Sequence, residues 1–239
     1  MNWKKCLTVL LSLTATLPVF ALDKPGFYMA AGMAFDATTA EDFGLVGLDS
    51  LPSSLLTDAG KAEFRGTLAA GYYYPLGPKY VIMVEAGKDT GGSTGFTTAA
   101  VLNASNGYSS QIDREWQFKR DWFFSIKPAL RLSEATLAYL SLSHHQGSVT
   151  GRSDLYIDCL LSCSTITSFS GSGRVSGTGI GLGLQATFEK MWFLRVEVES
   201  IRFNQFTASR GDPAIFTEYS SETLHPKSTI GRVMMGYRF

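Results

Sequence analysis

Large apolar residues alternate with small or polar residues along most of this chain. The first clear case is "GFYMAAGMAFD", residues 26–36. A period of two residues is typical of a β-strand, in which successive side chains point to opposite faces. One face of this segment would carry Phe27, Met29, Ala31, Met33 and Phe35.

The same alternation recurs in three longer segments, each interrupted by a turn. Each segment predicts a hairpin of two strands of roughly ten residues, the length that a tilted transmembrane strand requires. Together with the first and the last segment of the chain, the hairpins give eight strands. The hairpins cover residues 64–87 with a turn near Pro75, residues 116–145 with a turn near Glu134, and residues 176–203 with a turn near Lys190.

The chain ends on the strand-like segment "GRVMMGYRF", which carries Val233, Met235, Tyr237 and Phe239 on one face up to the terminal carboxylate. Chain ends usually fray unless they are paired. Hydrocarbon leaves no strand edge without hydrogen-bond partners, so transmembrane strands must close into a barrel. We therefore expect the last strand to pair with the first.

The connections between the predicted strands alternate between short and long. Three are tight turns, whereas four long stretches are polar and rich in Gly, Ser and Thr. An outer-membrane barrel has short periplasmic turns and long extracellular loops. The fold predicted is all-β: an eight-stranded antiparallel transmembrane β-barrel with both termini in the periplasm. The long stretches cover about residues 38–62, 88–114, 146–174 and 204–226. Two apolar patches within them, "FGLVGL" and "FTTAAVL", could extend strands above the membrane or form small hairpins.

The second face of the predicted strands carries Gly, Ser, Thr, Tyr and charged residues. A soluble β-sandwich would instead show a mostly charged outer face. Eight strands leave an interior just wide enough for side chains, so we expect a plug of paired charges, with a narrow channel as the alternative. The charged residues predicted to face the interior are Arg65, Glu85, Lys119, Asp121, Lys127, Arg195, Glu197, Glu199 and Arg232.

The composition is typical of a membrane protein and argues against nucleic-acid binding. Of the 239 residues 45% are hydrophobic and only 18% are charged, below the roughly 25% of soluble domains. The 21 basic and 21 acidic residues give a formal net charge of zero, which offers no electrostatic basis for nucleic-acid binding. No phosphate loop, dinucleotide fingerprint or metal-ligand set occurs, so we expect no cofactor and no metal.

The first 21 residues have the form of a signal peptide. Lys4 and Lys5 precede an apolar stretch, and Ala21 fits the small-residue rule for cleavage, so the mature barrel would cover residues 22–239. Two cysteines, Cys159 and Cys163, remain after cleavage. An oxidising compartment favours a disulfide between them, with two free thiols as the alternative.

Taken together, these patterns resemble the small eight-stranded outer-membrane barrels of Gram-negative bacteria: the transmembrane domain of outer membrane protein A, the opacity proteins and the attachment-invasion proteins. The ending "MGYRF" is the specific element, since Tyr237 and Phe239 match the terminal signal of that group. The resemblance implies an outer-membrane location, recognition by the barrel assembly machinery and periplasmic chaperones, contact with outer-membrane lipids including lipopolysaccharide, and a monomer.

Two motifs suggest more specific functions. His144 and His145 near Ser148 could serve a lipid A-modifying hydrolase, although no orienting carboxylate is fixed by spacing. The tripeptide Arg210, Gly211 and Asp212 could bind host integrins or matrix, although Gly-Asp-Pro is also ordinary turn chemistry. We expect a non-enzymatic surface protein whose four loops mediate adhesion or other surface contacts, with a solute channel and a hydrolase as alternatives.

Overall fold

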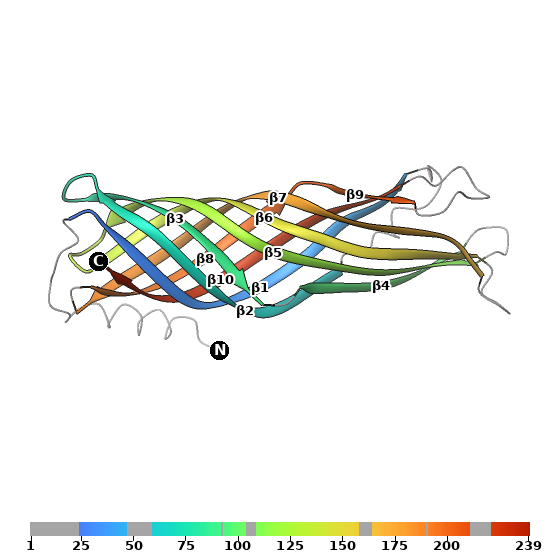
Figure 1. Cartoon of the computed structure of the whole chain (residues 1–239), viewed down its shortest axis with the longest axis horizontal. Helices are drawn as coiled ribbons and strands as arrows, with labels where there is room; N and C mark the ends of the chain where they lie inside the picture. The colour runs from blue at the N-terminus through green and yellow to red at the C-terminus, as the bar shows by residue number, and fades with distance from the viewer. Residues whose placement is uncertain are drawn as a thin grey trace.

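The structure is a computed structural model, which describes residues 24–46, 59–91, 93–103, 109–157, 164–189, 191–210 and 221–239. All regular secondary structure in these residues is β-strand, and no helix among them could span a membrane. The strands form one elongated antiparallel barrel (Figure 1). They are β1 (Gly26–Val46), β2 (Ala59–Pro75), β3 (Tyr80–Thr90), β4 (Thr94–Asn103), β5 (Ser109–Arg131), β6 (Thr136–Ile157), β7 (Ser164–Phe188), β8 (Trp192–Phe203), β9 (Phe206–Arg210) and β10 (Ser221–Arg238).

These ten strands make eight passages along the barrel wall. β3 and β4 both pair with β5 and run in the same direction, so β4 continues β3 after a break near Gly91. In the same way β9 continues β8, since both lie beside β7 and β10. The predicted number of strands is therefore confirmed.

The barrel closes through the pairing of β10 with β1, as the chain ending predicts. Their ladder runs from Tyr28↔Arg238 to Val46↔Ser221. We follow the row of cross-strand neighbours once around the barrel wall. The row starts at Met29 on β1 and returns to β1 at Thr39, so the strands are staggered by ten residues (39 − 29). Closure with stagger leaves no free edge at the level of this row, and it tilts the strands. The row runs Met29, Ala70, Ala86, Phe124, His144, Thr178, Arg202, Lys227 and Thr39.

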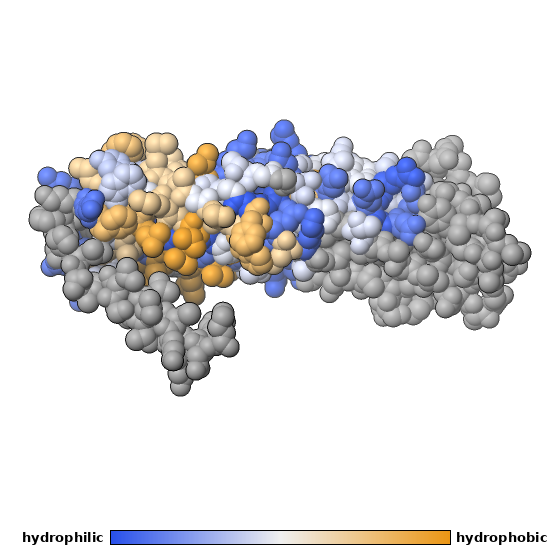
Figure 2. Space-filling view, turned by 90° about the horizontal axis from the view of Figure 1, so that it is seen from below, coloured by the Kyte–Doolittle hydropathy of each residue, from blue (hydrophilic) through white to orange (hydrophobic). Residues whose placement is uncertain are grey.

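Outward side chains form an apolar belt around the half of the barrel that ends in the tight turns. Phe27, Leu182 and Phe239 are 68%, 68% and 70% exposed, values that only a lipid environment makes favourable for so many large side chains. Figure 2 shows the belt as the orange zone, next to a blue and white zone on the other half. The protein is thus a transmembrane barrel.

The strands are longer than the sequence predicts. They run far beyond the apolar belt, and β7 alone has 25 residues. Much of the stretches predicted as long loops is strand; "FTTAAV" lies within β4, in line with the expectation that this apolar patch could extend a strand. We call the part of the barrel beyond the belt on this side the extension; in Figure 1 it points to the right, where β4 and β9 lie.

One β-bulge changes the face on which residues of β5 lie. Trp122 pairs with Gln146 and Arg120 with Gly147, so Asp121 is an extra residue without a partner on β6. The bulge shifts the alternation by one residue. Phe118 and Arg120 therefore point inward, and the predicted inward orientation of Lys119 and Asp121 is wrong: Lys119 is exposed and Asp121 half-buried.

Candidate functional site

The barrel interior at the level of the apolar belt is the most distinctive site. The structure places seven of the nine predicted charged residues there, all of them buried: Arg65, Glu85, Lys127, Arg195, Glu197, Glu199 and Arg232. It adds three that the prediction missed, Asp36, Asp89 and Arg120. Asp36 ends the predicted first segment on its second face, and Asp89 continues the alternation of β3, so extending that strand by two residues (89 − 87) finds it. Only the bulge brings Arg120 inward.

The part of this network nearer the tight turns is built around Glu85. Lys127 Nζ lies 2.5 Å from Glu85 Oε1 and 2.8 Å from Glu197 Oε2, and Arg195 Nη1 binds Glu85 Oε2. Tyr28 donates its hydroxyl to Glu85 Oε2 at 2.9 Å. Each charge therefore meets an opposite charge from another strand, which is what makes burial of these side chains tolerable.

The part nearer the extension is built around two arginines. Arg232 Nη1 lies 2.8 Å from Glu197 Oε1 and 2.5 Å from Glu199 Oε2. Arg120 Nη2 lies 3.3 Å from Asp36 Oδ2 and 3.2 Å from Asp89 Oδ2. Glu197 thus links the two parts, because it contacts both Lys127 and Arg232.

The network is electrically neutral. Five carboxylates face five cations, and all ten side chains are buried. An interior that selects ions would instead carry an excess of one sign. The carboxylates are Asp36, Glu85, Asp89, Glu197 and Glu199, and the cations are Arg65, Arg120, Lys127, Arg195 and Arg232.

Glycine on the inner face of β7 makes room for the large side chains. A Cβ on Gly183 would collide with the Tyr139 ring, and one on Gly179 would collide with Ser143 and Glu199. Tyr139 needs this space to donate its hydroxyl to Glu197 Oε2 at 2.8 Å. The glycines seen in the sequence therefore mark where the network fills the barrel.

Apolar side chains cover the network at both ends. In the extension Trp116, Phe118, Ile201, Phe203 and Ile230 belong to one buried cluster, in which the Phe118 and Phe203 rings are 4.7 Å apart. At the other end Tyr73, Val81, Met83, Leu137 and Phe193 belong to a second cluster.

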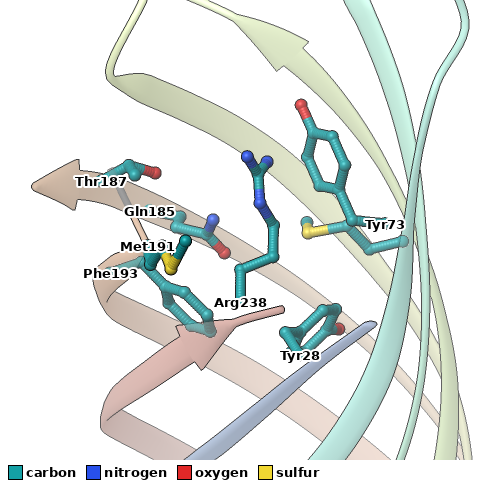
Figure 3. Close-up of a pocket in the computed structure, with 8 residues that line it drawn as sticks. Tyr28, Tyr73, Gln185, Thr187, Met191, Phe193 and Arg238 are labelled. Atoms are coloured by element: carbon teal, nitrogen blue, oxygen red, sulfur yellow. The ribbon is translucent and has the colours of Figure 1, made fainter. Parts of the chain in front are cut away.

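A small pocket remains beside the tight turns, between Tyr28, Tyr73, Met83, Phe193 and Arg238 (Figure 3). Arg238 points into it, across from Tyr73. Its free space is about 10 Å³, roughly that of one water molecule. None of the ten buried charges described above lines this pocket.

The histidines proposed for catalysis are placed differently from one another. His144 is exposed on the outer face, 6.0 Å from the Trp122 ring. His145 is fully buried, and its Nε2 faces both Ser143 Oγ at 3.0 Å and Glu199 Oε1 at 3.2 Å. In a hydrolase triad the serine and the carboxylate bind opposite nitrogens of the ring, so this trio has a different geometry. The described residues contain no group suited to hold a metal ion.

The remaining predicted residues lie at the chain end or outside the described residues. Tyr237 and Phe239 are in ring contact at 5.2 Å, and the Phe239 N–H donates to Phe27 O at 2.9 Å across the seam. Their role as an assembly signal stays a prediction. Several predicted features lie outside the described residues. They are the predicted signal peptide within residues 1–23, Cys159, Cys163, Gly211, Asp212 and the side chain of Arg210.

Comparison with known proteins gives likeness of fold only. No family model matches the chain, and no curated protein matches it. Similar solved structures include the attachment invasion locus protein Ail of Yersinia pestis, at 13% identity and a TM-score of 0.38 over 90% of this chain and 99% of Ail. The outer membrane protease OmpT from Escherichia coli is 11% identical, with a TM-score of 0.42 over 95% of this chain and 100% of OmpT. The outer membrane protein OprG from Pseudomonas aeruginosa is 12% identical, with a TM-score of 0.36 over 90% and 96%.

Proposed function

We propose that this protein is a non-enzymatic anchor in the bacterial outer membrane. Its barrel carries the extension, and four segments of the chain connect successive passages at that end. Those segments would contact host cells, matrix or other surface ligands. Loops held on a rigid scaffold are where binding residues concentrate.

The observation that carries this proposal is the filled interior. A neutral network of ten buried charges lies between two apolar clusters, so the described side chains favour a sealed anchor over a solute channel. The shared Nε2 of His145 favours a structural role for the buried histidine over nucleophilic catalysis.

The decisive test combines loop shortening with a folding assay. Two-residue turns replace four segments, singly and together: residues 47–58, 104–108, 158–163 and 211–220. The protein with all four segments shortened should no longer bind cultured epithelial cells or a fibronectin-coated surface, and the single replacements show which segment is responsible. The shortened protein should still show heat-modifiable migration on a gel. Binding that survives in the fully shortened protein would contradict the proposal.

Three further measurements test the tripeptide and separate the alternatives. Asp212→Glu alone tests the tripeptide, since it keeps the negative charge and the length of the segment but moves the carboxylate outward by one methylene. Planar-bilayer recordings should show no stable conductance; conductance that changes when Glu197 is replaced would favour the channel. An unchanged lipid A profile in cells that express the protein is expected if it is not a lipid A hydrolase.

A further inference from the structure

The small pocket beside the tight turns has a lining whose hydrogen-bond acceptors are already engaged. Gln185 Oε1 accepts from Arg195 Nη2 at 2.9 Å and from Arg195 Nε at 3.2 Å. Met83 Sδ accepts from Arg195 Nη2 at 3.7 Å, and Met191 Sδ accepts from the Tyr237 hydroxyl at 2.7 Å. These oxygen and sulfur atoms therefore have little capacity left for a guest in the pocket.

Hydrogen-bond donors, in contrast, remain available on β7. Arginine can only donate, so Gln185 presents its oxygen to Arg195 and directs the N–H groups of its amide elsewhere. Thr187 lies two residues further along β7 on the same inner face. Its side chain is buried, with 8% of the residue exposed, and its hydroxyl has no hydrogen-bond partner among the described residues. A buried hydroxyl of this kind requires a partner in the pocket.

The pocket also carries a positive charge. Arg238 reaches into it, and Gln185 and Thr187 lie around the same space (Figure 3). The guanidinium of Arg238 stays protonated at any physiological pH, and among the lining residues that the structure describes no other is charged. A cation beside neutral donors favours a negatively charged guest, because hydrogen bonds to an ion are stronger than those between neutral groups.

The size of the pocket restricts that guest to a single atom. The free space of about 10 Å³ is roughly that of one water molecule, which excludes phosphate, sulfate and carboxylate groups. A water molecule would fit, but it would also have to donate its own hydrogens to acceptors that are already engaged. A monatomic anion needs donors only. Chloride, which is not much larger than a water molecule, is the common anion of this kind.

The pocket lies where an ion can reach it from solution. Met191 on its rim is 44% exposed and Arg238 is half-buried, so the space is directly inside the end of the barrel that carries the tight turns. Gln185 and Thr187 belong to β7, whereas Arg238 ends β10, and β8 separates these two strands in the wall. An ion held by all three would therefore connect strands that share no backbone hydrogen bonds here.

We propose that Gln185, Thr187 and Arg238 bind one chloride ion in this pocket. The ion would satisfy the Thr187 hydroxyl and hold the end of the last strand against β7, and so stabilise the closed end of the barrel. This site is independent of the surface contacts proposed for the loops, because it lies at the opposite end of the barrel.

Bromide in place of chloride tests the site directly. Crystals of the full chain grown in sodium bromide should show an anomalous peak at the bromine absorption edge, between the Arg238 guanidinium and the Thr187 hydroxyl. Density in the pocket without an anomalous signal would identify a water molecule and would overturn the proposal. An empty pocket would overturn it as well.

Urea unfolding in micelles tests the same site in solution. Sodium chloride is exchanged for sodium gluconate at constant total concentration, so that general screening is unchanged. The ratio of folded to unfolded protein should rise about tenfold when chloride reaches about ten times its dissociation constant. Equal stability of the wild type in the two salts would contradict chloride binding.

Two variants and a matched control assign that response to the pocket. R238Q removes the charge and T187V removes the hydroxyl at nearly constant volume, so each should weaken or abolish the dependence on chloride. K79Q removes an exposed cation from the same end of the barrel, outside the pocket, and should keep the full dependence. Heat-modifiable migration verifies that each variant is folded. A chloride response that K79Q loses as much as R238Q would show a general charge effect and would overturn the proposal.

Discussion

In both halves of the barrel apolar and polar side chains alternate along each strand, but the apolar side chains point outward at the belt and inward in the extension. At the belt, apolar side chains such as Val198 and Val233 point outward while Glu197, Glu199 and Arg232 point inward. In the extension the arrangement is reversed. On β8, Ser200 and Arg202 face outward, while Ile201 and Phe203 belong to the buried cluster.

This inversion shows how the surroundings select the face. Lipid around the belt favours apolar groups outside, so polar groups go inside and must be paired. Water around the extension favours the arrangement of an ordinary soluble core. On β8 the apolar residues move from the outward positions, of which Val198 is the last, to the inward positions, of which Ile201 is the first. On β5 the bulge at Asp121 has the same effect, because it turns Trp116 and Phe118 inward.

Deleting Asp121 should have the largest effect on this division, because it removes the residue that joins the two phases on β5. Without it, residues 109–120 must either exchange faces or slip along both neighbouring strands. We expect loss of the heat-modifiable folded form. Asp121→Ala keeps the bulge and should fold; a deletion variant as stable as wild type would contradict the role given to the bulge.

Replacing Arg232 by Leu should produce the next largest effect. The change removes the cation that contacts Glu197 and Glu199, and it leaves buried negative charge uncompensated, at a cost of about 3–5 kcal/mol. Urea unfolding in micelles, followed by tryptophan fluorescence, measures the loss.

Arg152→Leu is the control for that measurement, since the Arg152 side chain is 64% exposed and pairs with Asp154. It should cost at most about 1 kcal/mol. Similar losses for the two arginines would show that the interior network is no more demanding than a surface pair.

A lysine placed on the outer surface should distinguish the two halves directly. Leu184 is the middle one of the outward residues 180, 182, 184, 186 and 188 on β7, and Leu184→Lys should destabilise the protein by about 2–4 kcal/mol because it puts a charge in lipid. Ser172→Lys lies on the same strand in the extension and should change stability by about 0.5 kcal/mol or less. The same urea assay compares the two variants. Equal losses of stability would contradict the assignment of Leu184 to lipid and of Ser172 to water.

The smallest expected effect is a pH dependence in the extension. Burial alone would raise the pKa of Asp154, but hydrogen bonds from Arg152 and Ser168 outweigh it and lower that pKa. A lowered pKa stabilises the folded state above the unfolded value of about 3.9, and the gain is lost as the pH falls through the folded value. Asp154→Asn should remove this small dependence from urea midpoints measured between about pH 6 and about pH 3. An identical pH profile in the variant would rule out Asp154 as its source.

Much of the fold could be predicted because lipid enforces a simple rule. Every outward position of the belt on β7 and β8 follows the predicted alternation, and the terminal strand pairs with the first as expected. The interior residues Glu85, Arg195 and Arg232 follow from the same rule, because what does not face lipid must face inward.

The ion pairs themselves could not be predicted in this way. Lys127 contacts Glu85 from β3 and Glu197 from β8, and no local pattern relates residues so far apart in the chain. Most of the extension falls in stretches predicted as long loops, because its polar outer face and glycines resemble loop composition. The apolar patches in those stretches were the signal that strands could extend above the membrane.

The sequence alone determined the number of passages, the closing of the last strand on the first and the composition of the inner face, since these follow from a period of two and from the exclusion of unpaired backbone from lipid. Only the tertiary structure decided the partner of each buried charge, the inward turn of Arg120 and the height at which the polarity inverts. Those depend on stagger between strands and on a single inserted residue, whose consequences appear only when distant segments lie side by side.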